Sequence, residues 1–471
     1  MSNLNINIKL KRKYFDRADK VFRFSLPVGI SILIIVFLFQ NTIYAYGSGG
    51  ISNSSQVSDK KFKASLVDHF VIIVQGGHSF DNYFGTFPNA DGFPKDIKIP
   101  LNPFSAKNTS YVKPFHIQFG KYFKPNDDNY RLSYNNGSMN GFIYASRNVP
   151  NNPQNVMGFY DNKNIPYYWQ FASEYVLAQR FFSPSMRSDL VNGLYAIGAD
   201  PSPYLNLKRI PENGLKVNRT IFDELESNGI SWKVYVENYS DIKYMDQQDK
   251  SKVIKNIPIL GINRFNDNQS LSSRFGDFFN YYRDIRTNNL PKVSYLYFTN
   301  TNDSPNTKIK DGQRLVATLV YALMKSNYWK STAIIVTQNE PGGWYDHVKP
   351  PINNNTKELY GFRLPTIFIS PYAKRGYIDS HVYDISSVLR FITSSLGLNS
   401  TLKSAENAGS IFQAFDFTMP PRKPIYFEEI SRETNLAKSK HIEGINNLYA
   451  ISLLIPTIIS IIWYRKERST G

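Results

Sequence analysis

The sequence predicts an α/β protein with a mostly parallel sheet and helices on both faces, flanked by one membrane-spanning segment near each end. Three observations lead to this prediction. Short apolar runs bounded by turn residues alternate with longer segments of helical apolar spacing, the pattern of parallel strands joined by helices. The 471 residues, 42% of them hydrophobic, can bury a large core. There is no cysteine, which excludes disulfide-stapled folds and thiolate metal sites.

The apolar runs and spacings place the individual elements. We expect strands at 70–74, 232–236, 293–298, 333–336 and 366–369. We expect helices at 167–182, 221–227, 314–325 and 385–395. These elements belong to one domain at 66–421. Within it, residues 86–160 are rich in Pro, Asn and Tyr, and we interpret them as an excursion over the functional edge of the sheet.

The N-terminal end has the composition of a targeting or anchoring segment. Residues 1–23 are basic, and residues 24–46 are uncharged and largely apolar. This pattern fits a secretory signal peptide cut near Ala45, or an uncleaved signal-anchor helix. The poor cleavage site favours retention of the segment. A Gly/Ser-rich tether at 47–65 follows.

The C-terminal end predicts a membrane-spanning helix. A polar stalk at 422–445 leads into an uncharged, Ile- and Leu-rich run at 446–464, which the basic tail at 465–471 closes. A run of this length can span a bilayer, and its basic flank is expected in the cytoplasm. A buried core helix is the alternative, and the abrupt basic stop disfavours it.

The charge distribution indicates location and partners. Both basic flanks point to the cytoplasm, so the large middle domain is expected outside the cell membrane. Nine Asn-x-Ser/Thr sequons agree with an exterior location. The net charge is +17, but the Lys and Arg residues outside the flanks are dispersed, which argues against nucleic acid. We expect the membrane and an anionic surface polymer or phosphoester ligand as partners. The oligomeric state is left open.

One loop carries a recognisable pattern. Residues 339–351 read Asn-Glu-Pro-Gly-Gly-Trp-Tyr-Asp-His-Val-Lys-Pro-Pro and follow a predicted strand. This loop resembles that of the phosphoesterase family of bacterial phospholipases C and acid phosphatases, which usually reads Asp-Glu-x-Gly-Gly-aromatic-aromatic-Asp-His-Val-x-Pro-Pro. Further matches in the same order occur at 72–85, 138–142, 165–169 and 369–377. The resemblance implies the alkaline-phosphatase-like version of the α/β fold.

The resemblance also implies a divalent metal held by hard oxygen ligands, which lowers the pKa of an attacking hydroxyl and neutralises developing charge. The family's metal-ligand positions fall on Gly76, Gly77, Asn339, Glu340 and Asp346. Several are substituted. Two glycines stand where the family has Glu-Asn, and an asparagine replaces the aspartate of the later loop. For Asp346 and its neighbour His347, a structural hydrogen bond that organises the Gly-Gly turn is the alternative interpretation.

The catalytic positions are changed as well. In the family's nucleophile loop, the matches at 192–195 place Asp189 at the hydroxyl position, with Ser188 beside it. Asp189 is a candidate nucleophile, although an anion there would repel phosphate. His347 is the candidate donor to the phosphoryl group. His78 replaces an arginine and is either a satisfied loop histidine or a new polar group. Residues 301–305 stand where the family often has a histidine before proline.

These substitutions lead to two functional hypotheses. The first is a membrane-anchored exterior protein that resembles the phosphoesterase family, whose members hydrolyse phosphoric esters. In this hypothesis the catalytic site has been lost. The protein would serve as a non-catalytic binding or surface component. The alternative is an active phosphoester hydrolase, of phospholipase C or phosphatase type. It would use Asp189 or Ser188 with Glu340, Asp346 and His347 around a modified metal site.

Overall fold

The computed structural model describes one domain, between residues 66 and 427, except for 106–109, 118–128, 150–151, 208, 243, 302, 304–307 and 354. Within this described part, no helix has both the length and the apolar character needed to span a bilayer. The two predicted membrane segments, 24–46 and 446–464, lie outside the described residues. Their topology therefore stays a prediction.

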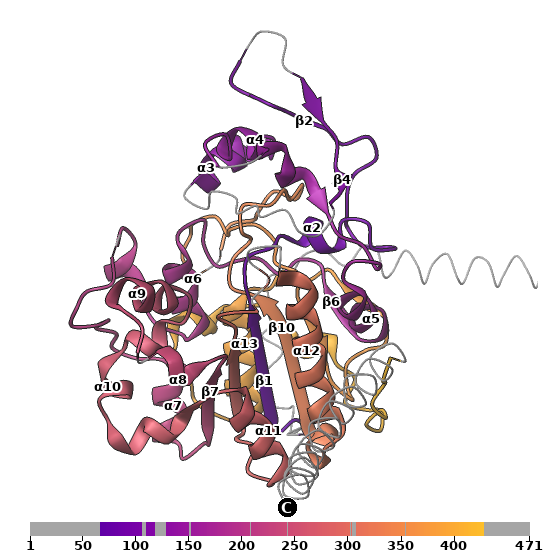
Figure 1. Cartoon of the computed structure of the whole chain (residues 1–471). Helices are drawn as coiled ribbons and strands as arrows, with labels where there is room; N and C mark the ends of the chain where they lie inside the picture. Colours follow the sequence, from indigo (N-terminus) through magenta and orange to yellow (C-terminus); the bar gives the residue numbers. More distant parts are fainter. Residues whose placement is uncertain are drawn as a thin grey trace, which may run out of the picture. The chain divides into compact units, whose positions relative to one another are not determined.

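An eight-stranded sheet forms the centre of the domain, in the order β12-β6-β11-β10-β1-β9-β7-β8 (Figure 1). Neighbouring strands are parallel except at β11, which runs antiparallel to β10 and β6. The predicted mostly parallel sheet is thus confirmed. The strands are β1 (His69–Gln75), β6 (Val176–Ala178), β7 (Trp232–Val236), β8 (Phe275–Gly276), β9 (Val293–Tyr297), β10 (Thr332–Gln338), β11 (Ile367–Ile369) and β12 (Tyr377–Asp379).

Helices cover both faces of this sheet. On one face, Phe391 of α13 (Ile385–Ser395) packs on Phe70, and Phe222 of α7 (Ile221–Ser227) packs on Tyr295. These strand residues share a face because Ile72, two residues after Phe70, pairs with Tyr295. The other face carries α5 (Pro166–Glu174), α11 (Phe278–Arg286) and α12 (Ile309–Met324). With both faces covered, β10 is buried at all seven positions.

Most predicted elements are present, and one is wrong in part. The helices at 221–227 and 385–395 and the strand at 232–236 have the predicted bounds. The helix predicted at 167–182 instead ends at Glu174, and β6 follows it. The reason is that residues 176–178 are held between two strands distant in sequence, β11 and β12, a contact that local apolar spacing does not reveal.

The segment at 86–160 forms the predicted excursion. Figure 1 shows α3 (Tyr130–Tyr134), α4 (Phe142–Ala145) and β2 (Ile99–Pro100) beyond the carboxyl ends of β1 and β10. The remaining short elements there are β3 (Tyr111–Val112), β4 (Phe115–His116) and β5 (Gly158–Phe159). Beside β7 and β8 lie α8 (Tyr239–Ile242), α9 (Gln247–Asn256) and α10 (Asn263–Asn266), and α6 (Asp189–Ala196) packs against α9.

Candidate functional site

The loops after β1 and β10 meet at the carboxyl edge of the sheet. The two strands are parallel neighbours and end in register at Gln75 and Gln338. The ladder continues one step further, because the backbone N–H of Asn339 donates to the carbonyl of Gln75 at 3.0 Å. Residues 75–82 and 339–347 therefore lie together at the edge where parallel α/β sheets present their ligands.

Gly77 and Gly342 pack backbone against backbone in this edge. A Cβ atom added to Gly77 would lie 2.7 Å from the Cα of Gly342 and 2.9 Å from Oε1 of Glu340. A Cβ atom added to Gly342 would lie 2.1 Å from the carbonyl oxygen of Gly77, and φ of Gly342 is +62°. Only glycine fits at either position without displacement of the other loop. The space of the implied Asn ligand at 77 is filled by backbone.

Glu340 and Asn339, two further predicted ligand positions, are buried, and each has a neutral hydrogen-bond partner. The hydroxyl of Tyr130 donates to Oε2 of Glu340 at 3.3 Å. Nδ2 of Asn339 donates to Oδ1 of Asn256 in α9 at 3.4 Å. Gly76 is half-buried and offers no side chain. Of the four positions 76, 77, 339 and 340, one therefore holds a carboxylate.

The predicted nucleophile loop lies at the start of α6. Ser188 is its exposed N-cap, without a side-chain cap hydrogen bond, and Asp189 is its first residue. Oδ1 of Asp189 is buried and has no hydrogen-bond partner among the described residues. This helix and the Asn339 loop both contact the segment at 255–258: Gly193 faces Pro258, and Asn339 reaches Asn256. The two loops are thus linked through α9.

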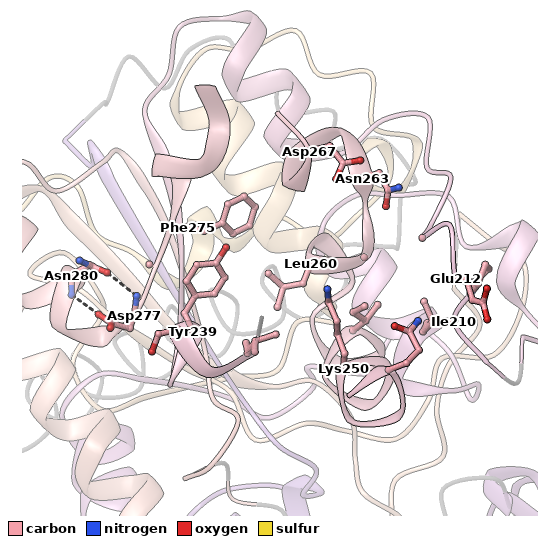
Figure 2. Close-up of a pocket in the computed structure, with 18 residues that line it drawn as sticks. Ile210, Glu212, Tyr239, Lys250, Leu260, Asn263, Asp267, Phe275, Asp277 and Asn280 are labelled. Carbon is pink, nitrogen blue, oxygen red and sulfur yellow. Dashed lines mark hydrogen bonds between the residues drawn. The ribbon is translucent and has the colours of Figure 1, made fainter. Parts of the chain in front are cut away.

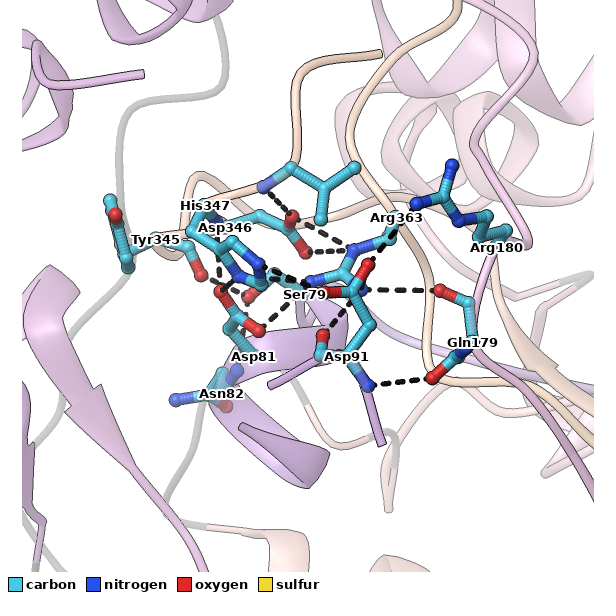
Figure 3. Close-up of polar contacts among 11 residues, drawn as sticks. Ser79, Asp81, Asn82, Asp91, Gln179, Arg180, Tyr345, Asp346, His347 and Arg363 are labelled. Atoms are coloured by element: carbon cyan, nitrogen blue, oxygen red, sulfur yellow. Dashed lines mark hydrogen bonds and ion pairs between the residues drawn. The ribbon is translucent and has the colours of Figure 1, made fainter. Parts of the chain in front are cut away.

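A buried ion-pair network holds Asp81, Asp346 and His347 (Figure 3). Ser79 caps α2 (Phe80–Phe84) and so fixes Asp81 in the first helical turn. Nε of Arg363 donates to both oxygens of Asp346, at 2.9 and 3.1 Å, and its Nη2 donates to Oδ1 of Asp81 at 2.9 Å. Oδ2 of Asp81 faces the backbone N–H and Nδ1 of His347, at 2.8 and 2.7 Å.

Arg363 was not identified from the sequence, and no motif pointed to it. Its side chain is fully buried. Nη1 donates to the carbonyls of Asp91 and Gln179 at 2.8 and 3.2 Å, and the guanidinium stacks over Phe80 at 4.4 Å. Asp91 also faces Nε2 of His347 at 3.4 Å. Arg363 is therefore the positive centre that holds the Asp346-His347 pair in place.

Burial and charge shift the pKa values in this network in opposite directions. Burial raises the pKa of Asp346 to about 6, against the lowering effect of Arg363. For His347, burial lowers the pKa, but the hydrogen bond and charge of Asp81 outweigh burial, so the pKa is raised above its ordinary value. The charge of Asp81 thus favours the protonated form of this imidazole over the neutral one.

The implied divalent metal can be tested against these residues. Ligand atoms of Asp81, Asp346 and His347 lie within 4.8 Å of one another, which makes them a possible metal-binding group. However, each of the four carboxylate oxygens already accepts a hydrogen bond, three of them from Arg363. The guanidinium occupies the place of a cation. Glu340 is also the single carboxylate among positions 76, 77, 339 and 340, so this arrangement does not fit a hard divalent metal.

His78 and Asp303 form a second buried polar group nearby. The ring of His78 stacks on Tyr83 and Trp344, with centroids 4.7 and 5.3 Å away, and contacts Oδ1 of Asn82 and the carbonyl of Asp303. Burial lowers the pKa of His78 to about 4, so its imidazole is neutral. A neutral imidazole can donate to only one of these two oxygens, so one hydrogen bond and the two stacked rings hold His78 in the loop.

Asp303 was overlooked in the sequence, although an acidic residue soon after a parallel strand is a signal for it. It follows β9 and is fully buried. The hydroxyls of Tyr83 and Tyr168 donate to its Oδ2 at 2.8 and 2.9 Å. Its Oδ1 has no hydrogen-bond partner among the described residues. Burial raises the pKa of Asp303 to about 7.

A cavity of about 500 Å³ lies apart from these loops (Figure 2). It opens between α8, α9, α10 and β8, and none of its lining residues comes from 75–82, 187–192 or 339–347. Tyr239 and Phe275 stack in its wall, with centroids 6.0 Å apart. Asp277 and Asn280, also in the wall, cap α11 reciprocally, so their polar groups are already used.

Comparison with known proteins identifies relatives of the chain. Residues 67–399 match the model of the phosphoesterase family. The chain is 27% identical over 414 residues to phospholipase C A of Mycobacterium tuberculosis, with 75% of this chain and 78% of that protein covered. It is 26% identical over 347 residues to non-specific phospholipase C1 of Arabidopsis thaliana, covering 65% and 61% of the two chains.

Solved structures are more distant. A protein of the alkaline phosphatase superfamily from Vibrio parahaemolyticus aligns with a TM-score of 0.34 and 15% identity, over 56% of this chain and 66% of that chain. The lipoteichoic acid synthase LtaP from Listeria monocytogenes aligns with a TM-score of 0.37 and 9% identity, over 71% and 73% of the two chains.

Proposed function

We propose that this chain, which belongs to the phosphoesterase family, is a membrane-anchored protein whose domain lies outside the cell and binds its partner without hydrolysing a phosphoric ester. By family it is a phosphoric ester hydrolase related to phospholipases C. This member would have kept the α/β fold and lost the metal-ligand and nucleophile residues that hydrolysis requires. Its anchoring rests on the predicted membrane segments at 24–46 and 446–464.

The observation that carries the proposal is the contact between Gly77 and Gly342. A substituted ligand position alone leaves room for a metal to be held by other groups. Here the room itself is absent, because the two backbones are too close for a Cβ atom on either residue. A cation at this edge would have Glu340 as its one carboxylate among positions 76, 77, 339 and 340, which is too little charge for a hard divalent metal.

The ion-pair network supports the same conclusion. Removal of the family metal would leave buried carboxylates without a counter-charge, which is costly. Asp81 and Asp346 are instead neutralised by Arg363, whose guanidinium contacts both. The Asp346-His347 pair therefore has a structural role in this proposal, and it organises the Gly-Gly turn that closes the site.

One observation favours the alternative of an active hydrolase. Oδ1 of Asp189, at the family's nucleophile position, is buried without a hydrogen-bond partner among the described residues. Buried polar atoms are normally satisfied, and exceptions occur at reactive groups. An aspartyl nucleophile would need a cationic or metal partner for the phosphoryl oxygens, however. The unpaired oxygen alone therefore gives the weaker hypothesis.

Metal titration tests the proposal directly. Full-length protein in detergent is titrated with Mn²⁺, Ca²⁺ and Zn²⁺ by calorimetry. We expect no saturable binding tighter than about 1 mM at this edge, and the same heats for Glu340→Gln. Glu358→Gln is the matched control, because Glu358 lies in an exposed ion pair with Arg187. One-to-one binding that Glu340→Gln abolishes and Glu358→Gln preserves would contradict the proposal.

A further inference from the structure

Exposed aromatic rings gather on the excursion above the sheet. Phe104 and Tyr111 are 51% and 56% exposed, in contrast to most large apolar side chains of the domain. Both belong to the hairpin in which β2 pairs with β3. Phe104 meets Tyr144 of α4 edge to face, with ring centroids 5.1 Å apart. We call Phe104, Tyr111 and Tyr144 the aromatic face.

A cationic side chain lies over the ring of each tyrosine in the aromatic face. The guanidinium of Arg147 lies 4.0 Å from the ring centroid of Tyr144, and Nζ of Lys98 lies 5.1 Å from that of Tyr111. Arg147 also donates to the carbonyl of Tyr144 at 2.8 Å, which holds its guanidinium in place. Such contacts preorganise the side chains, so less conformational freedom is lost when a ligand binds.

The described stretches that carry the aromatic face have a net positive charge. Within the described stretches 94–105, 110–117 and 129–149 there are five Lys and Arg residues against one acidic residue, Asp96. Asp96 is itself paired with Lys113 at 3.9 Å. Elsewhere in the domain, cations and acids are mixed. An anionic partner is therefore the one that this surface attracts.

We propose that the aromatic face binds an acidic polysaccharide, which deepens the proposed binding function and rests on its exterior location. The C–H face of a sugar ring can lie on an aromatic ring, whose face is negative. The carboxylate of a uronic acid can at the same time accept hydrogen bonds from a guanidinium such as that of Arg147. Aromatic rings interleaved with cations supply both contacts in a single ligand.

Both ends of the described domain lie at the amino edge of the sheet, away from the aromatic face. The described domain begins at Leu66, next to the start of β1, at the amino edge of the sheet. It ends at Phe427, whose backbone N–H donates to the hydroxyl of Tyr321 in the last turns of α12. This helix returns from β9 to the start of β10, so its end also lies at the amino edge. The hairpin of β2 and the helix α4, which carry the aromatic face, lie beyond the opposite edge (Figure 1).

The test measures binding by full-length protein in phosphatidylcholine nanodiscs. The probes are polygalacturonate, neutral dextran, inorganic polyphosphate and phosphatidylglycerol vesicles. We expect Phe104→Ala/Tyr111→Ala to weaken polygalacturonate binding at least about tenfold, as loss of two stacking contacts implies. Tyr244→Ala/Phe279→Ala is the matched control, because these side chains are 79% and 71% exposed elsewhere, and it should change binding less than about twofold.

Further variants separate ring stacking from charge. Lys98→Gln/Arg147→Gln should weaken binding to both polygalacturonate and polyphosphate, whereas Lys330→Gln/Lys403→Gln, at exposed sites, should do so much less. The aromatic pair variant should leave polyphosphate binding unchanged, because polyphosphate has no sugar ring. Tyr111→Ala alone, which removes no packing on α4, should still weaken polygalacturonate binding about threefold, so a misfolded Phe104 variant does not decide the question.

Two results would overturn this proposal. One is equal polygalacturonate binding by the aromatic pair variant and its control. The other is loss of vesicle binding in the aromatic variant with polygalacturonate binding unchanged, which would make the face a membrane contact. Phosphoester hydrolysis by the unmodified protein would instead refute the proposed function and leave these binding differences intact.

Discussion

Gly77 and Gly342 face each other so closely that neither position has room for a side chain. This contact joins the loop after β1 to the loop after β10, the two loops that carry the implied metal ligands in the family. A substitution of ligands is thus accompanied by closure of the space between them. We therefore infer that closure of this space, and not only the missing side chains, prevents a catalytic metal from binding here.

The first prediction concerns this contact. Gly77→Ala should lower the free energy of unfolding by about 1–3 kcal/mol, because its Cβ atom would overlap the backbone of Gly342. Urea unfolding of the full-length protein, followed by tryptophan fluorescence, measures the change. Gly76→Ala is the matched control, because Gly76 is half-buried and lacks a positive φ, and it should change stability by less than about 0.5 kcal/mol. Equal effects of the two changes would argue against the close packing.

The second prediction concerns Arg363. Arg363→Met should destabilise the domain by about 3–5 kcal/mol, because two buried carboxylates lose their shared counter-charge. Arg180→Met removes a half-exposed partner of Asp91 and should cost less than about 1 kcal/mol. Thermal and urea unfolding of the two variants compare these values. A small effect of Arg363→Met would show that the network is not the main support of the Gly-Gly turn.

The same residue permits a test by gain of function. Arg363→Ala vacates the centre of the Asp81, Asp346 and His347 group, whose ligand atoms already lie within 4.8 Å. We expect Zn²⁺ to raise the melting temperature of this variant and not that of the unmodified protein. Arg363→Ala combined with Asp346→Asn should lose the response. A Zn²⁺-dependent rise in the unmodified protein, lost in Asp346→Asn, would show that the guanidinium does not exclude the cation.

The third prediction is a pH dependence that originates at Asp303. Burial raises the pKa of this carboxyl to about 7, so the folded protein keeps a proton that the unfolded chain releases near pH 4. The stability contributed by this group is complete below about pH 4 and is lost as the pH rises to about 7. The asparagine of Asp303→Asn does not ionise, so the stability of this variant does not fall in that pH range for this reason. Its stability relative to the unmodified protein should therefore increase by roughly 4 kcal/mol between pH 4 and pH 7.

Unfolding free energies at several pH values measure this difference. Asp96→Asn, which removes an exposed carboxylate, is the control, and its difference should vary by less than about 0.5 kcal/mol. A flat difference for Asp303→Asn would mean that the Asp303 carboxyl stays ionised, with Tyr83 and Tyr168 supplying enough hydrogen bonding to hold the charge.

The fourth prediction concerns topology. If the segment at 24–46 is retained, both termini should be cytoplasmic, because basic residues flank both apolar segments on the same side. Protease added to intact cells should remove the domain at 66–421 and spare a tag on the C-terminus. The same tag should be digested once the membrane is permeabilised. Digestion of the tag in intact cells would refute the predicted orientation.

Most helices and strands could be predicted because the apolar patterns and end residues that define them lie within each segment of sequence. The strand at 232–236 and the helix at 385–395 have clear apolar patterns and turn residues or an Asp cap at their ends. The strand at 176–178 was missed because three apolar residues after a helix continue its pattern. It pairs with β11 and β12, whose residues lie 190 to 201 positions further along the chain.

The sequence pointed to some residues of the candidate site, but not to Arg363, Asp303 or the arrangement of the loops. The sequence showed that Gly77 lacks a ligand side chain, whereas its contact with Gly342 requires the two loops to be in place. Arg363 belongs to no motif, and a buried guanidinium is recognised only through the carboxylates around it. Asp303, too, is recognised only in the folded structure, because its raised pKa comes from burial by residues distant in sequence.

Hydrolysis by the purified full-length protein tests the central claim most directly. Simple phosphomonoesters, phosphodiesters and phosphatidylcholine are offered with and without Mg²⁺, Mn²⁺, Ca²⁺ or Zn²⁺. The account predicts release of product at the background rate in every case, because losing a single member of a catalytic unit already removes orders of magnitude in rate. Robust turnover that Glu340→Ala or Asp189→Ala abolishes, and that Glu358→Ala preserves, would contradict it.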